Sequence, residues 1–396
     1  MSPPRVTLRP GREKSLRQRH PWVFSGAIAS VAGTPRAGDT VTLHASGGEF
    51  LASAAWSPAS NIRARVWSFD PAEVVGAALF RARVESAVRA RDGLLEAQHT
   101  GCRLVHAESD GLPGFIADRY DEVLVVQLLT AGAEAWRNEL IEALCDASGC
   151  SAAYERSDAD VRELEGLAPR KGVVRGSPPE QLSFLEGGLR YRVDIAQGQK
   201  SGFYLDQRPN RSRVRALAAG RDVLDGFCYS GGFTCAALAG GAHSVLAIDS
   251  SAAALALARE NVTANRLDSA RVDWRDADVF SELRRLRDAG ATFDLIVLDP
   301  PKLAPTARHA EKASRAYKDA NLLALKLLRP GGLLATFSCS GGVSAELFQK
   351  ILAGAALDAR VGAMVIGRFG PSADHPVALS FPEGDYLKGL LLRRGA

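Results

Sequence analysis

The chain has 396 residues and a net charge of +4, and it is long enough for two or three domains with full cores. Its composition is that of a globular protein, and it contains neither an apolar run of about 18 residues nor the apolar core of a signal peptide, so we expect a cytoplasmic protein without a membrane span. The six cysteines include no Cys-x-x-Cys pair, which argues against a zinc ribbon or a redox dithiol and predicts free thiols without a bound metal.

The N-terminal segment is the most basic part of the chain. Residues 1–20 hold six Lys and Arg side chains against one acid, a charge of +5, so the other 376 residues sum to −1. Basic side chains beside Trp22 and Phe24 suit the phosphate backbone of a nucleic acid. A solvated basic arm is the alternative interpretation.

Two domains are predicted in the first half of the chain. Residues 1–70 have the pattern of a small β-barrel, with short strands at 5–8, 40–43, 50–56 and 62–69 separated by Gly and Pro. Residues 71–185 predict a central α+β domain. Its expected elements are a helix over 72–98, a pair of strands at 103–107 and 122–129, a helix near 134–147, a strand near 152–156 and a loop over 166–179.

Residues 186–396 predict the third domain. A hairpin around Gly187-Gly188, with strands at 182–186 and 189–195, comes first. Strands at 223–225, 244–249, 270–274, 293–299 and 333–338 then alternate with helices near 231–239, 251–264, 279–289, 313–328 and 344–357. This alternation predicts an α/β fold with a doubly wound, Rossmann-like parallel sheet. Two closing strands, 362–368 and 386–393, have no helix between them and predict an antiparallel pair.

The first strand of this sheet leads into a glycine loop, Asp225-Gly226-Phe227-Cys228-Tyr229-Ser230-Gly231-Gly232. Glycine lets the backbone approach a ligand closely. The order differs from the Gly-x-Gly-x-x-Gly fingerprint of a pyrophosphate site, and Asp225 would repel phosphate and attract a cation. S-adenosylmethionine (SAM) carries an ammonium and a sulfonium but no phosphate, so we favour SAM over NAD.

Further acidic residues follow the next strands. Asp249 ends the second strand, 24 residues after Asp225, where a carboxylate can bind both hydroxyls of a ribose. Capping of the following helix, together with Ser250 and Ser251, is the alternative, and both roles are compatible. Asp278 follows the third strand and could reach an adenine amino group. Asp276 is its competitor, and helix capping is again the alternative.

A carboxylate and a thiol end the fourth and fifth strands. Asp299 precedes Pro300-Pro301, which stop the strand and stiffen the turn, and it could contact the polar edge of a flipped base. Cys339 lies in Ser338-Cys339-Ser340, and a buried hydrophobic role is its alternative. A thiolate that adds to C6 of cytosine makes C5 nucleophilic enough to attack a methyl sulfonium. Cys228 and Cys235 flank the glycine loop and are interpreted as packing residues.

These motifs resemble the bacterial 23S rRNA cytosine-C5 methyltransferases of the large-subunit methyltransferase I type, over essentially the whole chain. The resemblance is carried by six segments: residues 20–24 (HPWVF), residues 198–208 (GQKSGFYLDQR), the Asp225 loop, residues 299–302 (DPPK), residues 338–340 (SCS) and residues 374–376 (DHP). It implies an N-terminal PUA domain, a central α+β domain and a C-terminal class I SAM-dependent methyltransferase domain.

The resemblance also implies roles for individual residues. Cys339 would be the nucleophile, with Asp299 as the second catalytic residue. Residues 203–208 would border the cofactor pocket, although Phe203 and Tyr204 could equally be core aromatics and Arg208 part of an ion pair. Together with the residues at the strand ends, the predicted cofactor-binding set is Tyr204, Gln207, Arg208, Asp225, Phe227, Gly231, Asp249, Ser250, Asp278 and Asp299, with S-adenosylhomocysteine (SAH) as the product.

One position departs from related enzymes. Many other RNA cytosine-C5 methyltransferases carry a second Cys directly after Pro-Pro, where this chain has Lys302. The group that removes the C5 proton is therefore left open between water, Asp299 and another residue.

The sequence thus predicts a SAM-dependent enzyme that forms 5-methylcytosine in 23S rRNA, on a base that leaves its stack. The PUA-like domain would bind the RNA by its backbone and shape. The oligomeric state is open, with a homodimer as one form. Two alternatives remain at this stage: methylation of another base atom with a structural Cys339, or a non-catalytic RNA-binding protein. The intact set of Asp225, Asp249, Asp299 and Cys339 disfavours the second.

Overall fold

The fold is that of a computed structural model, which describes residues 3–304 and 310–395. The chain forms two compact units. Unit 1 consists of Met1–Leu185, Val193–Phe203 and Ala373–Gly384, and unit 2 of Glu186–Arg192, Tyr204–Ser372 and Asp385–Ala396. A short segment near the C-terminus thus packs in unit 1, although the chain on both sides of it belongs to unit 2.

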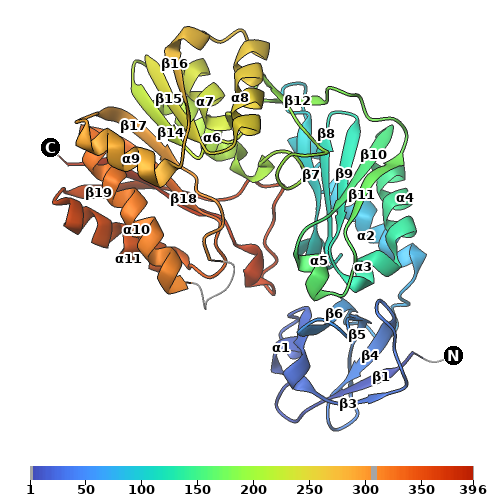
Figure 1. The fold of residues 1–396 in the computed structure, drawn as a ribbon. Coiled ribbons are helices and arrows are strands. Elements are labelled where there is room, and N and C mark those ends of the chain that lie inside the picture. Colours follow the sequence, from blue (N-terminus) through green and yellow to red (C-terminus); the bar gives the residue numbers. More distant parts are fainter. Residues whose placement is uncertain (1–2, 305–309, 396) are drawn as a thin grey trace. The chain divides into compact units, whose positions relative to one another are not determined.

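A six-stranded sheet forms the N-terminal part of unit 1 (Figure 1, blue). Strand β1 is hydrogen-bonded on both edges, antiparallel to β3 and parallel to β4, and its alternate residues Val6 and Leu8 are fully buried. The basic N-terminal segment therefore contributes a strand to a folded sheet, and its six Lys and Arg side chains are all exposed, as the solvated alternative expects. In sheet order the strands are β2 (Trp22–Phe24), β6 (Ile62–Ser68), β5 (Phe50–Trp56), β4 (Thr40–His44), β1 (Arg5–Leu8) and β3 (Ile28–Ala32), with helix α1 (Lys14–Arg17) between β1 and β2.

The rest of unit 1 is a five-stranded sheet packed against helices, as expected for an α+β domain. Helices α2 and α4 bury Phe80, Val84, Leu140 and Leu144 in one core with the sheet. The strands, in sheet order, are β11 (Arg170–Arg175), β10 (Ala152–Ser157), β9 (Val123–Leu128), β8 (Phe115–Tyr120) and β7 (Gly101–His106). The helices are α2 (Ala77–Arg89), α3 (Ala131–Ala135), α4 (Arg137–Ser148) and α5 (Val161–Leu164).

Three predictions for this part are wrong in detail. The helix over 72–98 is reduced to α2, because it begins only after Gly76 and ends before the turn at Asp92-Gly93. The strands at 103–107 and 122–129 do not pair with each other, because the unpredicted strand β8 lies between them and pairs with both β7 and β9. The loop over 166–179 contains β11, an edge strand that pairs only with β10 and tolerates Gly172 at φ +147°.

The segment Ala373–Gly384 is fixed in unit 1 by buried polar contacts. The side chain of Asp374 is fully buried, and its Oδ2 accepts the backbone N–H of Arg103 at 3.0 Å. Arg91, which is 2% exposed, donates to the Asp374 carbonyl oxygen and holds the Asp110 carboxylate with two bonds of 2.7 and 2.9 Å. Removing one partner of such a buried pair costs about 3–5 kcal/mol. The residues 374–376 that carried part of the resemblance therefore stabilise unit 1.

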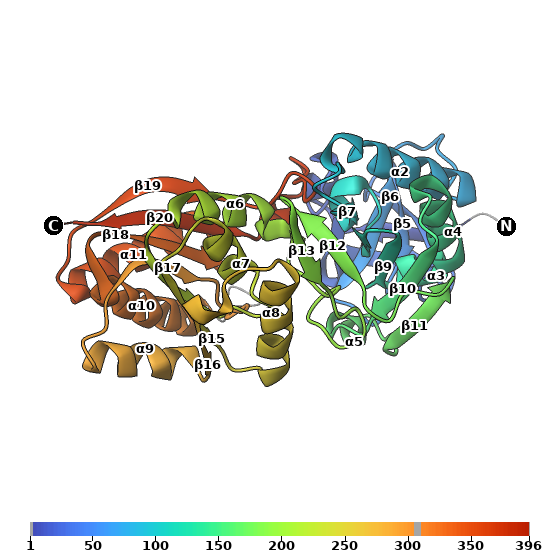
Figure 2. The ribbon, with the colours of Figure 1, turned by 90° about the horizontal axis from the view of Figure 1, so that it is seen from above.

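Unit 2 is built on a seven-stranded sheet (Figure 2). In sheet order the strands are β16 (Val272–Asp276), β15 (Ser244–Asp249), β14 (Asp222–Gly226), β17 (Phe293–Leu298), β18 (Leu328–Ser338), β20 (Lys388–Arg394) and β19 (Ala363–Phe369). The first five are parallel, whereas β20 runs antiparallel to β18 and to β19. The predicted doubly wound sheet and its closing antiparallel pair are confirmed. The shorter strands β12 (Ser183–Glu186) and β13 (Leu189–Arg192) form a two-stranded sheet.

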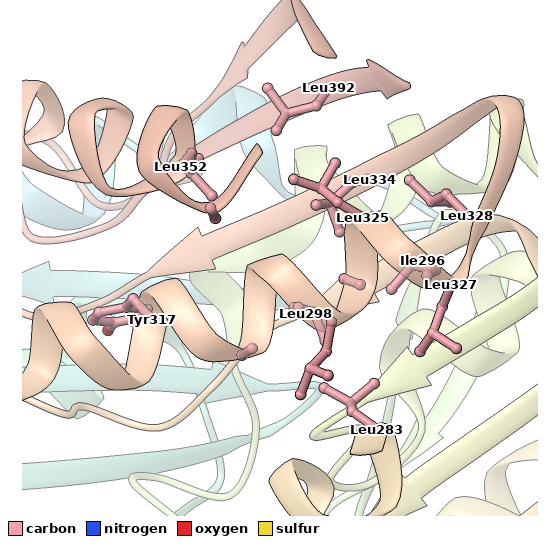
Figure 3. Close-up of a cluster of buried hydrophobic side chains, with 14 of the residues drawn as sticks. Leu283, Ile296, Leu298, Tyr317, Leu325, Leu327, Leu328, Leu334, Leu352 and Leu392 are labelled. Carbon is pink, nitrogen blue, oxygen red and sulfur yellow. The ribbon is translucent and has the colours of Figure 1, made fainter. Parts of the chain in front are cut away.

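The main core of unit 2 lies between this sheet and helices α9, α10 and α11 (Figure 3). Leucine and isoleucine side chains of the strands, such as Ile296 and Leu334, meet Leu283 of α9 and Leu352 of α11. The opposite face is covered in part by α8, whose Leu255 packs on Ala247 of β15. The helices of unit 2 are α6 (Arg208–Leu217), α7 (Gly232–Ala239), α8 (Ala252–Ala264), α9 (Val279–Asp288), α10 (Ala310–Leu327) and α11 (Ala345–Ala359). None of the helices in the described part of the chain is both long and apolar enough to cross a membrane.

Candidate functional site

The sheet of unit 2 reverses its order between β14 and β17, because β15 and β16 lie on one side of β14 and the later strands on the other. In open α/β sheets ligands bind at such a switch point, outside the carboxyl ends of the strands. Asp225 lies on β14, Asp249 ends β15, and Asp299 and Cys339 directly follow β17 and β18. The fold therefore brings the predicted site residues of four strands to one edge of the sheet.

The glycine loop after β14 has an unusual backbone. Phe227 and Tyr229 have φ values of +65° and +46°, in the left-handed region that costs a non-glycine residue about 1–2 kcal/mol. Gly231 has φ +77°, and a Cβ there would lie 2.9 Å from the Cβ of Ala258, so the position requires glycine. The loop is held from β15, because Oδ2 of Asp249 accepts the Tyr229 N–H at 2.8 Å. Strain retained in this way is typical of functional loops.

Asp225 is a buried carboxylate with unused hydrogen-bonding capacity. It is 1% exposed, and its Oδ2 accepts a bond of 2.6 Å from the Thr234 hydroxyl. Its Oδ1 is buried and has no partner among the described residues. Burial raises the pKa of Asp225 to about 7, and repulsion from Asp299 and Asp249 adds to this, although the Thr234 hydrogen bond acts against it. A cation that lies against Oδ1 would supply the missing partner.

Asp249 uses both carboxylate oxygens on backbone N–H groups, Oδ2 for Tyr229 and Oδ1 for Ser251 at 2.9 Å. Ser251 itself is the N-cap of α8 and accepts the N–H of Ala254, while Ser250 is exposed. The half-buried Asp249 therefore supports the glycine loop and the start of α8. Each carboxylate oxygen has a second lone pair, so these contacts leave room for a ribose hydroxyl.

Asp278 and Asp276 lie at the end of β16 and are both exposed. Asp278 caps α9, because its Oδ1 accepts the N–H and the hydroxyl of Ser281 at 2.9 and 2.7 Å. Asp276 is the direct neighbour of Asp249 in the register of β15 and β16. The helix-capping alternative for Asp278 is confirmed, and its Oδ2 stays available for a ligand.

Asp299 is oriented by residues of the segment that precedes α6. Gln207, which is 2% exposed, donates from Nε2 to Asp299 Oδ2 at 2.9 Å. Asn210 Nδ2 donates to Gln207 Oε1 at 2.5 Å and to the Gly370 carbonyl oxygen at 3.0 Å, which fixes the orientation of the Gln207 amide. Gln207 was among the predicted residues. Asn210 was not, and an Asn in a first helical turn gives no sequence signal for this role.

The other predicted residues of this segment contribute to its packing. Tyr204 contacts Tyr229 edge to face at 5.5 Å, and its pKa is raised by burial and by the nearby Asp299 and Cys339. Arg208 approaches Glu186 at 3.8 Å, as the ion-pair alternative expected. Arg211, which was not predicted, holds the same Glu186 with two bonds of 2.6 and 2.8 Å and donates to the Tyr204 carbonyl oxygen.

Phe203 is a core aromatic of unit 1, where it packs on Phe184 at 5.0 Å. The core interpretation of this residue is therefore confirmed.

Cys339 is the one half-buried thiol of the chain, because the other five cysteines are buried. Its Sγ lies 3.9 Å from the carbonyl oxygen of Pro300, in the turn that follows Asp299. The buried Ser338 and Ser340 on either side both share hydrogen bonds with the hydroxyl of Tyr317, at 2.9 and 3.0 Å. The serines therefore orient the turn around the thiol.

Comparisons with known proteins show the family and the fold of this chain. The chain matches the family described as S-adenosylmethionine-dependent methyltransferase over residues 112–354, and a PUA-like domain over residues 6–69. Proteins of Shewanella denitrificans and Erwinia tasmaniensis, both named "Ribosomal RNA large subunit methyltransferase I", are each 49% identical to this chain, over 98% of it and 99% of their own length. The solved structure of SMU.776, complexed with SAH, has 22% identity and a TM-score of 0.86 over 98% of this chain and 99% of its own, and it shows the same fold.

Proposed function

We propose that this chain, which belongs to the S-adenosylmethionine-dependent methyltransferase family together with the proteins named ribosomal RNA large subunit methyltransferase I, forms 5-methylcytosine in 23S rRNA. The position of Cys339 is the observation that supports cytosine as the methylated base and C5 as the methylated atom. The thiol is half-buried and lies beside Pro300, in the turn that follows Asp299, at the carboxyl ends of adjacent strands. A thiol and a carboxylate so placed suit a cytosine that has left its stack.

The residues at the switch point fit SAM, which supplies a methyl group as a sulfonium and leaves as SAH. The unpartnered Oδ1 of Asp225 suits the ammonium group, and the glycine loop admits a ligand close to the backbone. We assign the ribose hydroxyls to Asp249 and the adenine to the side of Asp278. The rest of the boundary of the proposed SAM site is formed by Tyr204, Gln207, Arg208, Phe227 and Ser250.

The proposed chemistry begins with the Cys339 thiolate. The sulfur adds to C6 of cytosine, and the electron pair of the C5–C6 double bond becomes available at C5. C5 attacks the methyl carbon, and the bond from that carbon to the sulfonium sulfur breaks, with its electron pair left on the sulfur. The proton at C5 then leaves to a base, for which water, Asp299 and another residue are the candidates. The electron pair of the broken C–H bond restores the double bond and expels the thiolate, so that the enzyme is regenerated.

The direct test is bisulfite sequencing of 23S rRNA from a strain that lacks the gene and from the same strain with the gene restored. We expect one cytosine to lose its protection from conversion in the deletion strain and to regain it on restoration. RNA that contains 5-fluorocytosine should form a denaturation-resistant complex with the protein. Methyl transfer to rRNA without such a complex, and with unchanged bisulfite patterns, would instead favour another base atom.

We further propose that the PUA-like part of unit 1 contacts the rRNA. A cavity of about 260 Å³ lies beside α1, and the exposed Arg12, with Ser15, Trp22 and Phe24, is among its lining residues. A cationic side chain next to aromatic rings suits a phosphate and a base of single-stranded RNA. Lys14 is also exposed and adds to the positive charge of this surface.

Replacing Arg12 and Lys14 by glutamine should weaken rRNA binding and flatten its salt dependence, because each lost phosphate contact removes about 0.7–0.9 from the log–log slope. Binding measured between 50 and 300 mM salt tests this, with Arg287→Gln on α9 as the control. Point changes are preferable to a deletion of residues 1–70. Arg65 and Ser57 bond the buried Glu165, and a deletion would remove both of these partners and leave only the Ala131 N–H among its hydrogen-bond donors in the described part of the chain. If the salt dependence of rRNA binding kept its wild-type slope, the RNA would not contact the surface that carries Arg12 and Lys14.

A further inference from the structure

We propose that Lys388 is a positioning residue that holds the turn of Cys339 through two backbone carbonyl groups and stabilises the Cys339 thiolate. The inference rests on the proposed role of Cys339 as the nucleophile. Lys388 belongs to β20, the last strand along the chain, nearly 50 residues after Cys339 in the sequence.

The geometry places Lys388 at the turn. Lys388 is the first residue of β20, directly opposite Ser338 in the antiparallel register with β18. Its Nζ donates to the carbonyl oxygens of Ser340 and Val343, at 2.8 and 2.7 Å. These two bonds span the turn after Cys339. The turn is closed by a backbone hydrogen bond from the Val343 N–H to the Ser340 carbonyl oxygen, which measures 3.1 Å.

Lys388 lies near the thiol, because its Nζ is bonded to the carbonyl oxygen of Ser340, the residue that follows Cys339. Burial lowers the pKa of the Lys388 ammonium, while the negative charges of Asp385 and of a Cys339 thiolate raise it and the cation of Lys302 lowers it. The interaction acts on both groups equally. A Cys339 thiolate stabilises the charged form of Lys388, and the Lys388 ammonium stabilises the thiolate by the same free energy.

A cation is needed at this turn because most of its neighbours do not favour a thiolate, and the other cation, Lys302, is exposed. Tyr204 before α6, Tyr317 on α10 and Lys388 on β20 interact electrostatically with Cys339. The charged or titratable groups that act on these three include Asp206, Tyr229, Asp299 after β17, Lys302 after the two prolines and Asp385, three residues before β20. Asp299 repels a thiolate, and burial disfavours any charge. Cysteine nucleophiles are activated by a neighbouring cation in such surroundings.

The test measures how fast iodoacetamide alkylates Cys339 between pH 6 and 10, by intact mass spectrometry of the full chain, with Cys339→Ala as the blank. In the wild-type protein we expect the inflection below about 8.5, the ordinary thiol pKa. Lys388→Met should raise it by at least about one unit, so the rate at pH 7.5 falls about tenfold while the rates at pH 10 agree within about twofold. Lys388→Arg should keep the inflection within about half a unit.

Methyl transfer provides the second measurement. Its rate in Lys388→Met should fall about tenfold at pH 7.5 and recover at pH 9, which a simple loss of structure would not do. Lys350→Met, a change in an exposed lysine paired with Glu346 on α11, is the matched control and should behave as the wild type.

An alkylation profile of Lys388→Met that superimposes on the wild type overturns the proposal. A wild-type inflection at or above 8.5 does the same, even if Lys388→Met does not fold. If Lys388→Met shifts alkylation but not methyl transfer, and Cys339→Ala remains active, Lys388 stabilises the thiolate but the proposed nucleophile is wrong.

Discussion

Replacing Cys339 by alanine should abolish methyl transfer, with a rate at least about 10³-fold below the wild type, while SAM affinity stays within about threefold. The thiol acts only in the covalent step, and the proposed cofactor contacts are made by other residues. The substitution also removes little volume, because Cys339 is half-buried and alanine lacks only the sulfur atom, which lies 3.9 Å from the Pro300 carbonyl oxygen. A collapse of the fold is therefore not the expected cause of the loss.

Cys150→Ala is the matched control, because Cys150 is a buried packing thiol in the core of unit 1. It should keep full activity and still form the complex with 5-fluorocytosine RNA, whereas Cys339→Ala should form none. Near-normal turnover in a folded Cys339→Ala protein would show that the sulfur is not the nucleophile. Methylation of a base atom that needs no covalent intermediate would then become the better proposal.

The sheet of unit 2 was predictable from the sequence because strands and helices alternate regularly and its central strands contain short apolar runs, such as residues 245–248 in β15 and 295–298 in β17. Asp249 ends β15 and Asp299 directly follows β17, as expected, because each of these runs stops at a polar residue. The sequence was less informative where elements are short or amphipathic. Strand β8 and edge strand β11 escaped prediction, and α2 is much shorter than its apolar periodicity indicated.

The supporting residues of the site could not be predicted, because they meet their partners only in the folded chain. Tyr317 and Lys388 lie 21 and 48 residues from the serines that they hydrogen-bond. Asn210 reaches the carbonyl oxygen of Gly370, 160 residues away. Such contacts depend on the order of strands in the sheet and on how α6 and α10 pack, and single-sequence patterns contain no signal for either.

SAM affinity should rise with pH between 5.5 and 7.5, by about 20-fold, through the ionisation of Asp225. The pKa of this carboxyl is raised to about 7, first by burial and then by Asp299 and Asp249, so it is mostly neutral in the free protein at pH 5.5. Because the pKa of Asp225 is raised in the folded protein, this group contributes its full share to the free energy of unfolding of the free protein below about pH 4. That contribution is lost as the pH rises through 7. A bound ammonium reverses this preference, because it favours the charged carboxylate.

Calorimetry at several pH values, in buffers of different ionisation enthalpy, measures both the affinity and the protons released. About one proton should be released per SAM bound at pH 5.5, and the release should decrease as the pH passes 7. The rise in SAM affinity is measured only up to pH 7.5, because the α-amino group of the ligand begins to lose its proton near pH 7.7–8.0. Asp225→Asn should bind weakly with a flat profile. Asp222→Asn, on the same strand, should keep the wild-type slope, because hydrogen bonds from His243 and Ser244 lower the pKa of Asp222 to about 2, outside this window. If Asp225→Asn retained the slope, the ammonium of SAM would have to be assigned to another carboxylate.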